Sequence, residues 1–264
     1  MNSNESNPIS HPSSEALALE KSYRLNDIVK QREKTLSRLN LKAGEKVLDL
    51  GCGVGFLAHE MAKIVGKSGL VICLDQNKEM IEHTKKRCEN MKQTYFYIGN
   101  AYDLPCEDNS LDAVSCTQVL LYVENISLVI SEIKRVLKTG GRIIIVETDW
   151  RGVVISNSNN SLTKKIFSAW DKTVANPNLP IHLKPILKKN GFSKILVEAI
   201  PILNTEYNPN NFSHDIMKWI TKNAHDSGVI SKNEKTLWLN ELEKHEKEGS
   251  YFFCVNRFLF SAFL

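Results

Sequence analysis

The stretch Lys46–Ala58, KVLDLGCGVGFLA, decides the fold of this chain. Its apolar residues before Gly51 predict a short buried strand of a parallel sheet. Three glycines at alternate positions follow at once, and from Phe56 onward apolar residues recur at helical spacing. A strand, a glycine turn and a helix bring bare backbone and a helix N-terminus up to a nucleotide-like ligand. We therefore predict an α/β fold with a ligand-binding turn at this position.

The spacing of the glycines separates two kinds of ligand. The dinucleotide fingerprint G-x-G-x-x-G needs a third glycine where this chain has Phe56. The pattern here is D-x-G-x-G-x-G, formed by Asp49, Gly51, Gly53 and Gly55. A carboxylate ahead of the first glycine repels a pyrophosphate and suits a cationic ligand that carries an amine. The turn therefore favours a nucleoside with a positive charge.

This pattern resembles the first motif of class I S-adenosylmethionine-dependent methyltransferases, and the resemblance extends, motif by motif, to Glu147. The segment Lys138–Arg142 and the helix before it are similar to the R-V-L-K-P-G-G-R stretch of the ubiquinone/menaquinone-type (type 11) branch, with Thr139 in place of the proline. The resemblance implies a Rossmann-like, seven-stranded, mostly parallel sheet with an antiparallel last strand and helices on both faces. It also implies S-adenosylmethionine as cofactor and S-adenosylhomocysteine as product.

Two further segments are expected to hold the cofactor. Asp75 ends the second predicted strand, where a carboxylate can accept both hydroxyls of a ribose; an ordinary helix N-cap is the alternative. The turn at 99–105 is similar to the adenine-binding turn, and Asn100 keeps an acceptor oxygen where many relatives have Asp. The resemblance assigns cofactor contacts to Asp49, Gly51, Cys52, Gly53, Gly55, Phe56, Asp75, Gln76, Met80, Asn100, Ala101, Tyr102, Gln118 and Leu120.

The acceptor side is less defined by the sequence. Tyr23, Tyr122, Asp149 and Trp150 are predicted to line a substrate pocket. Because the sulfonium already activates the methyl group, the protein mainly aligns the reactants and excludes water, and no universal catalytic residue is expected. If the nucleophile is an oxygen that needs a base, the candidates are Tyr122, Asp149 and His182. No metal is expected, because the H-E sequence at His59 lacks the second histidine of H-E-x-x-H.

The organisation along the chain is that of one domain. Residues 1–14 are rich in Ser, Asn and Pro and are expected to be a disordered tail, and 15–264 to be a single methyltransferase domain. A helix is predicted at 16–39. A helical insertion at about 205–249, between the sixth and seventh strands, is predicted to cap the active site, and its second helix opens with a Ser231/Glu234 capping box.

Composition excludes several other classes. The 264 residues are 42% hydrophobic, and 34 basic against 30 acidic residues give a net charge of only +4, without a basic run suited to nucleic acid. No apolar run is long enough to span a membrane. The six cysteines form no C-x-x-C pair, which is typical of reduced cysteines in a cytosolic protein. The Asn/Asp-Pro-Pro-aromatic box of base-methylating enzymes is absent after the fourth predicted strand, 111–116.

We therefore expect a cytosolic methyltransferase that acts on a small, apolar or aromatic acceptor, without nucleic acid as partner. A nicotinamide-dependent oxidoreductase is the first rival, but the third glycine and a Tyr-x-x-x-Lys pair are both missing. A catalytically silent cofactor-binding protein is the second, since an intact cofactor site does not require turnover. A nucleic-acid or protein methyltransferase remains open on fold grounds alone. The oligomeric state is not predicted.

Overall fold

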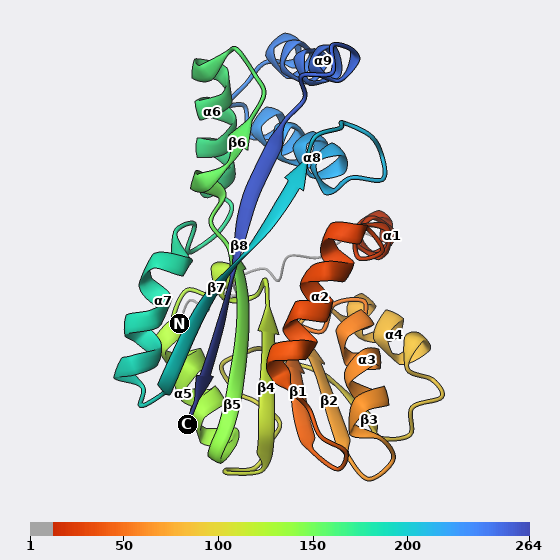
Figure 1. Cartoon of the computed structure of the whole chain (residues 1–264), viewed down its shortest axis with the longest axis vertical. Helices are drawn as coiled ribbons and strands as arrows, with labels where there is room; N and C mark the ends of the chain where they lie inside the picture. The colour runs from red at the N-terminus through yellow and green to blue at the C-terminus, as the bar shows by residue number, and fades with distance from the viewer. Residues whose placement is uncertain (1–12) are drawn as a thin grey trace, which may run out of the picture.

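The computed structural model describes residues 13–264, with side chains from Ala16 onward (Figure 1). Residues 1–12 of the expected tail lie outside this range. The helices are α1 (Ser13–Ser22), α2 (Asn26–Leu39), α3 (Phe56–Val65), α4 (Lys78–Arg87), α5 (Ile126–Val136), α6 (Asn160–Asp171), α7 (Leu179–Lys189), α8 (Phe212–Asp226) and α9 (Lys232–Lys247), with short 3-10 turns η1 (Leu120–Tyr122) and η2 (Trp150–Gly152). The strands are β1 (Lys46–Leu50), β2 (Leu70–Asp75), β3 (Thr94–Ile98), β4 (Leu111–Thr117), β5 (Leu137–Thr148), β6 (Val154–Ile155), β7 (Ser193–Asn204) and β8 (Phe253–Phe263).

One mixed sheet organises the fold, with strand order β3-β2-β1-β4-β5-β8-β6 and β7 paired with β8. Strands β1 to β5 are parallel to one another, and β8 is antiparallel to β5, β6 and β7. The carboxyl ends of β1 to β5 therefore share one edge of the sheet, where ligands bind in α/β proteins. The expected Rossmann-like sheet with an antiparallel last strand is confirmed.

The expected number of strands was wrong by one. The described part of the chain has eight strands, and the additional one is the two-residue strand β6, which was not predicted. The first residues of β8 extend past the end of β5, and Val154 and Ile155 pair with Cys254 and Phe253 there. Two residues cannot produce a recognisable alternation in the sequence.

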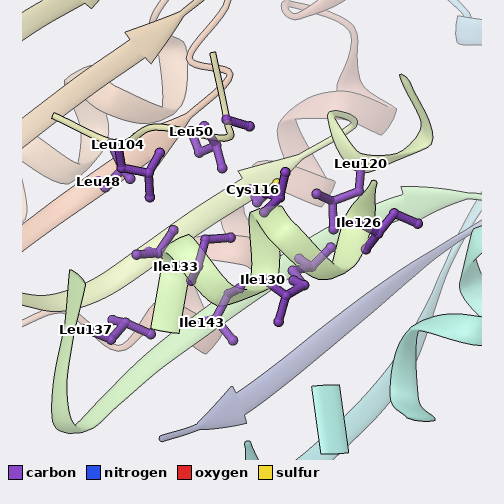
Figure 2. Close-up of a cluster of buried hydrophobic side chains, with 14 of the residues drawn as sticks. Leu48, Leu50, Leu104, Cys116, Leu120, Ile126, Ile130, Ile133, Leu137 and Ile143 are labelled. Carbon is purple, nitrogen blue, oxygen red and sulfur yellow. The ribbon is translucent and has the colours of Figure 1, made fainter. Parts of the chain in front are cut away.

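Both faces of the sheet are covered, as the buried strand sequences require. One face packs on α5 and α7, and its core gathers apolar side chains from the loops and strands beneath α5 (Figure 2). The opposite face packs on α2 and α3 through Leu39, Met61 and Ala62. The amphipathic helix α5 buries Ile126, Ile130 and Ile133 on a single face, at spacings of three and four residues. These two layers hold the ends of β1, β2 and β4 in fixed positions.

Three helices stand beyond the carboxyl edge of the sheet (Figure 1). Helices α8 and α9 come from the segment between β7 and β8, where the insertion was predicted, and α9 begins with the predicted Ser231/Glu234 capping box. Helix α6 precedes β7 in the chain and packs against both α8 and α9. The three helices share one aromatic core with the projecting ends of β7 and β8. We call α6, α8 and α9 the cap.

The N-terminal helix is divided, whereas the sequence predicted one helix over 16–39. Helix α1 ends at Ser22, and α2 begins after Leu25, whose backbone is extended. At the break Leu25 is buried in the cap core, and Tyr23 packs both against this core and beside Phe56. Helical periodicity continues across the break, so the sequence pattern did not reveal it. None of the helices within 13–264 has the length and apolar character needed to cross a bilayer.

Candidate active site

The glycine turn between β1 and α3 has the left-handed backbone that glycine permits. Gly51, Gly53 and Gly55 have φ of 72°, 52° and 82°. A Cβ on Gly51 would lie 2.2 Å from Val119 Cγ2, and one on Gly55 would lie 2.8 Å from Thr84. A Cβ on Gly53 would meet only the Tyr23 hydroxyl, at 3.9 Å. The outer two glycines therefore serve packing, and Gly53 keeps a space open above the turn.

Asp75 is joined to this turn at the end of β2. Its Oδ2 accepts a hydrogen bond from the Gly53 amide at 2.9 Å, and its Oδ1 accepts from the Asn77 amide at 2.9 Å. The helix N-cap of α4 is Asn77, whose side chain accepts from Glu79, so the alternative N-cap role for Asp75 is taken by another residue. Asp75 therefore braces the glycine turn from the tip of β2.

Replacing Asp75 by alanine is expected to weaken binding of S-adenosylhomocysteine by roughly 1.5–3 kcal/mol, because a charge-assisted hydrogen bond is lost. The support of the Gly53 amide is removed at the same time. Isothermal titration calorimetry measures the change, with Asp108→Ala, an exposed aspartate of the loop before β4, as control. Equal affinities of wild type and Asp75→Ala would remove Asp75 from the site.

Asp49 is a buried carboxylate at the end of β1, only 2% exposed. Its Oδ2 has no hydrogen-bond partner among the described residues. It lines a cavity between α2 and the glycine turn, together with Tyr23, Gln31 and Thr117. Burial, and then the charge of Asp75, raise the pKa of Asp49 to about 7. An unsatisfied acid in this place fits a ligand that brings a cation, which is the group that the amine of S-adenosylmethionine supplies.

The pKa of Asp49 predicts how cofactor affinity depends on pH. Below about pH 7 the acid is mainly protonated, and pairing with the ligand ammonium requires loss of that proton. Affinity for S-adenosylhomocysteine should therefore rise from about pH 5.5 through pH 7 and level off about one pH unit above the pKa. Calorimetry across this range should show the rise in wild type and a flat profile in Asp49→Asn. The same profile in both proteins would assign the pH dependence to another group.

Tyr23 closes the turn from above. Its ring stacks on Phe56 with centroids 6.0 Å apart, and burial raises the pKa of its phenol. Phe56 is in turn surrounded by the guanidinium groups of Arg24, Arg32 and Arg87, the last 3.5 Å from the ring centroid. Cys52 is buried beside Thr84 beneath the turn. The structure thus brings Tyr23, predicted for the acceptor pocket, directly to the glycine turn.

The other residues predicted for the cofactor follow β2 and β3, and those after β3 form the turn that is similar to the adenine-binding turn. Gln76 is exposed, and Met80 is buried against Val54 and Ala16. Asn100 is exposed, and its Oδ1 accepts from the Tyr102 amide at 2.8 Å, so the side chain shapes the turn in which it lies. The amide oxygen retains a second lone pair. Ala101 is buried in the core beside α5, and Tyr102 is partly exposed.

At the end of β4 two predicted cofactor residues have different environments. Gln118 has φ of 56°, a left-handed conformation that is uncommon for a residue with a side chain. Its Oε1 accepts from the Thr148 hydroxyl at 2.7 Å, and its Nε2 donates to the Val146 carbonyl at 3.1 Å. Strain of this kind concentrates at functional sites. Leu120, in contrast, is fully buried in the core beside α5.

The predicted acceptor residues are divided between two regions. Trp150 is buried in the cap core, with ring centroids 5.9 Å from Trp170 and 6.4 Å from Phe212. Asp149 caps the turn η2 through the Arg151 amide at 3.1 Å. His182 is exposed on α7, where its ring pairs with Asn178, and it is not brought to the glycine turn.

The side chain of Tyr122 is partly exposed. Burial of its phenol, and then the charge of Glu147, raise the pKa of the phenol to about 12. It therefore keeps its proton at neutral pH. In this state Tyr122 can donate a hydrogen bond to the methyl acceptor, but it is poorly suited to remove a proton from it.

Two buried charged residues were missed by the sequence reasoning. Glu147 ends β5, and its Oε1 accepts from the amides of Val119 and Leu120 at 3.0 and 2.8 Å. Its Oε2 has no partner among the described residues, and burial raises the pKa of this carboxyl to about 8. Arg257 lies on β8 and is 7% exposed. The available signal was a single charged residue within the mainly apolar strand 253–263.

Comparisons with known proteins place this site in a family. A methyltransferase-domain family model matches residues 41–200, more than half of the chain. A demethylmenaquinone methyltransferase of Lactobacillus johnsonii is 33% identical over 193 residues, covering 64% of this chain and 76% of that protein. An uncharacterized 37.1 kDa protein in transposon TN4556 of Streptomyces fradiae is 29% identical over 229 residues, covering 86% of this chain and 65% of that protein.

A solved structure shares the fold at low sequence identity. Phosphoethanolamine N-methyltransferase 2 of Haemonchus contortus, in complex with phosphomonomethylethanolamine and S-adenosylhomocysteine, aligns with a TM-score of 0.61 and 20% identity. The alignment covers 95% of this chain and 57% of that one. The chain therefore belongs to the methyltransferase-domain family and has the fold of the class I S-adenosylmethionine-dependent methyltransferases.

Proposed function

We propose that this protein transfers a methyl group from S-adenosylmethionine to a small, apolar or aromatic molecule. The observation that carries the proposal is the buried, unsatisfied oxygen of Asp49 beside a glycine turn that Asp75 braces. These two acids are suited to two polar groups of the methyl donor, its ammonium and its ribose hydroxyls. One relative is named a demethylmenaquinone methyltransferase. Its named substrate is a small molecule, which supports this choice.

The roles of the residues follow from their positions. Asp49 would hold the ammonium, Asp75 would accept the ribose hydroxyls, and Gly53 would leave room for the ligand against the backbone. The bound donor supplies an activated methyl group on sulfur for SN2 transfer. Tyr23 covers the turn and excludes water, and Gln118 fixes the end of β4 through its bonds to β5. The protein's contribution is alignment and desolvation.

The character of the acceptor comes from the cap. Aromatic side chains of α6, α8 and η2 form its core above the carboxyl edge of the sheet, among them Trp150, Trp170 and Phe212. We propose that the acceptor binds between this aromatic core and the edge of the sheet, where an apolar or aromatic molecule is favoured over a charged polymer. We keep a nucleic-acid or protein methyltransferase, and a catalytically silent cofactor-binding protein, as the alternatives.

The test has two stages. Calorimetry with S-adenosylhomocysteine should give binding, whereas NADH should give none. Incubation with methyl-labelled S-adenosylmethionine and a panel of phenols, quinols and amines should then transfer label to a small molecule. Label that appears only in protein or nucleic acid would support the corresponding alternative. Cofactor binding without transfer to any member of the three classes would support the silent one.

A further inference from the structure

Arg257 carries a positive charge that the protein itself leaves incompletely paired. The side chain is 7% exposed, and none of the described carboxylates forms an ion pair with it. One guanidinium nitrogen donates to the neutral amide oxygen of Gln31, and Nε has no partner among the described residues. A buried charge without a counter-ion is costly, so buried arginines are normally paired. An arginine left in this state, bonded to a residue that lines the cavity above the glycine turn, is suited to an anionic ligand.

The position of Arg257 separates it from the predicted cofactor site. In the order β2-β1-β4-β5-β8, the residues predicted for the cofactor come from β1, β2 and β4 and from the loop after β3. Arg257 is on β8, on the far side of β5, and pairs in register with Thr148 at the carboxyl end of that strand. Gln31, its hydrogen-bond partner, also lines the cavity above the glycine turn. The guanidinium therefore borders the site from the acceptor side.

The surroundings of Arg257 are aromatic. The guanidinium lies over the ring of Phe212 from the cap, 5.1 Å from its centroid. The phenols of Tyr23 and Tyr122 and the carboxyls of Glu147 and Asp27 lie near enough to feel its charge. Among the described residues neither acid is hydrogen-bonded to Arg257: Glu147 accepts from two backbone amides through Oε1 and leaves Oε2 without a partner, and Asp27 accepts from Asn204 at 2.8 Å. The acceptor side thus combines aromatic side chains with the guanidinium of Arg257.

We propose that Arg257 binds a carboxylate group of the methyl acceptor, so that the acceptor is a small aromatic or apolar acid. This inference rests on the proposed function and narrows its substrate class. A guanidinium matches a carboxylate through two parallel N–H bonds, and a single positive charge matches a single negative one. A phosphate dianion fits less well, because Asp27, Asp49 and Asp75 add negative charge to the same region. The carboxylate of the methyl donor is the other possible source, and the experiment separates the two.

The experiment compares benzoate with its neutral isostere benzamide, titrated by calorimetry into the full chain saturated with S-adenosylhomocysteine. Wild type should bind benzoate at least about tenfold more tightly than benzamide. Arg257→Met, which keeps the volume without the charge, should lose this preference, and Arg257→Lys should retain part of it. Arg38→Met is the matched control, since Arg38 pairs with Glu198 on the outer side of α2. It should behave as wild type.

Two results would overturn the proposal. The first is a wild-type protein that binds benzoate no better than benzamide, a comparison that needs no variant to fold. The second is Arg257→Met with weakened binding of S-adenosylhomocysteine but unchanged binding of 5′-methylthioadenosine, which lacks the amino-acid end. That pattern would assign the guanidinium to the carboxylate of the donor. Absence of S-adenosylhomocysteine binding in wild type would instead contradict the proposed function, and this titration comes first.

Discussion

Gly53→Val should abolish measurable binding of S-adenosylhomocysteine, with a loss of more than about a hundredfold, or roughly 2.7 kcal/mol. Two effects act in the same direction. Gly53 has φ of 52°, which a β-branched residue adopts only with strain. The methyl groups of the valine would also extend into the space between the turn and the Tyr23 hydroxyl. The ligand is predicted to contact the protein backbone in this space. Calorimetry measures the loss directly.

Gly66→Val is the matched control for backbone strain. Gly66 ends α3 with φ of 66°, and a Cβ there would have no neighbour within 4 Å. Both variants should lose some stability in urea denaturation, but only Gly53→Val should lose the ligand. If Gly53→Val still binds S-adenosylhomocysteine as wild type does, the glycine turn has a function other than holding the methyl donor.

The parts of the site that the sequence predicted are local in the chain. The glycine turn follows β1, and Asp49 and Asp75 lie at the carboxyl ends of β1 and β2, which the parallel sheet brings to one edge. A motif of a few residues therefore fixes both its own conformation and its place in the fold. The same reasoning predicted the start of α9, because a capping box is a contact between residues three apart.

The parts that were missed depend on contacts between distant segments. Arg257 meets Gln31 across 226 positions, and no local pattern in either segment indicates the contact. The burial of Leu120 is decided by helix α5 and the neighbouring strands, although its place after β4 suggested a cofactor contact. The break near Tyr23 also coincides with tertiary contacts, because Tyr23 stacks on Phe56 and Leu25 is buried in the cap core. Periodicity carries no information on such pairings.

The cap was predicted only in part for the same reason. Its helices α8 and α9 come from the expected insertion, but α6 lies some forty residues earlier and contacts both. Trp238 of α9 joins these segments. It is 1% exposed, and its indole Nε1 donates to the Thr163 hydroxyl of α6 at 2.9 Å. The stability of the cap should therefore depend on this one side chain.

Trp238→Ala should lower the free energy of unfolding by about 3–5 kcal/mol, the usual cost of truncating a fully buried aromatic side chain. The cavity would lie in the cap core, and the lost hydrogen bond would leave the Thr163 hydroxyl without this donor. Affinity for S-adenosylhomocysteine should change by less than about threefold, because the glycine turn belongs to other core clusters. Urea denaturation and calorimetry measure the two quantities.

Two variants of the same helix separate the causes. Leu237→Ala removes a neighbouring side chain that is 66% exposed and should cost less than about 0.5 kcal/mol. Trp238→Phe keeps most of the volume but loses the N–H donor, so its cost should lie between those of the two alanine variants. If Trp238→Ala remains folded and yet loses the methyl donor, the cap supports the cofactor site itself. The division of labour proposed here, with the sheet edge binding the donor and the cap binding the acceptor, would then be wrong.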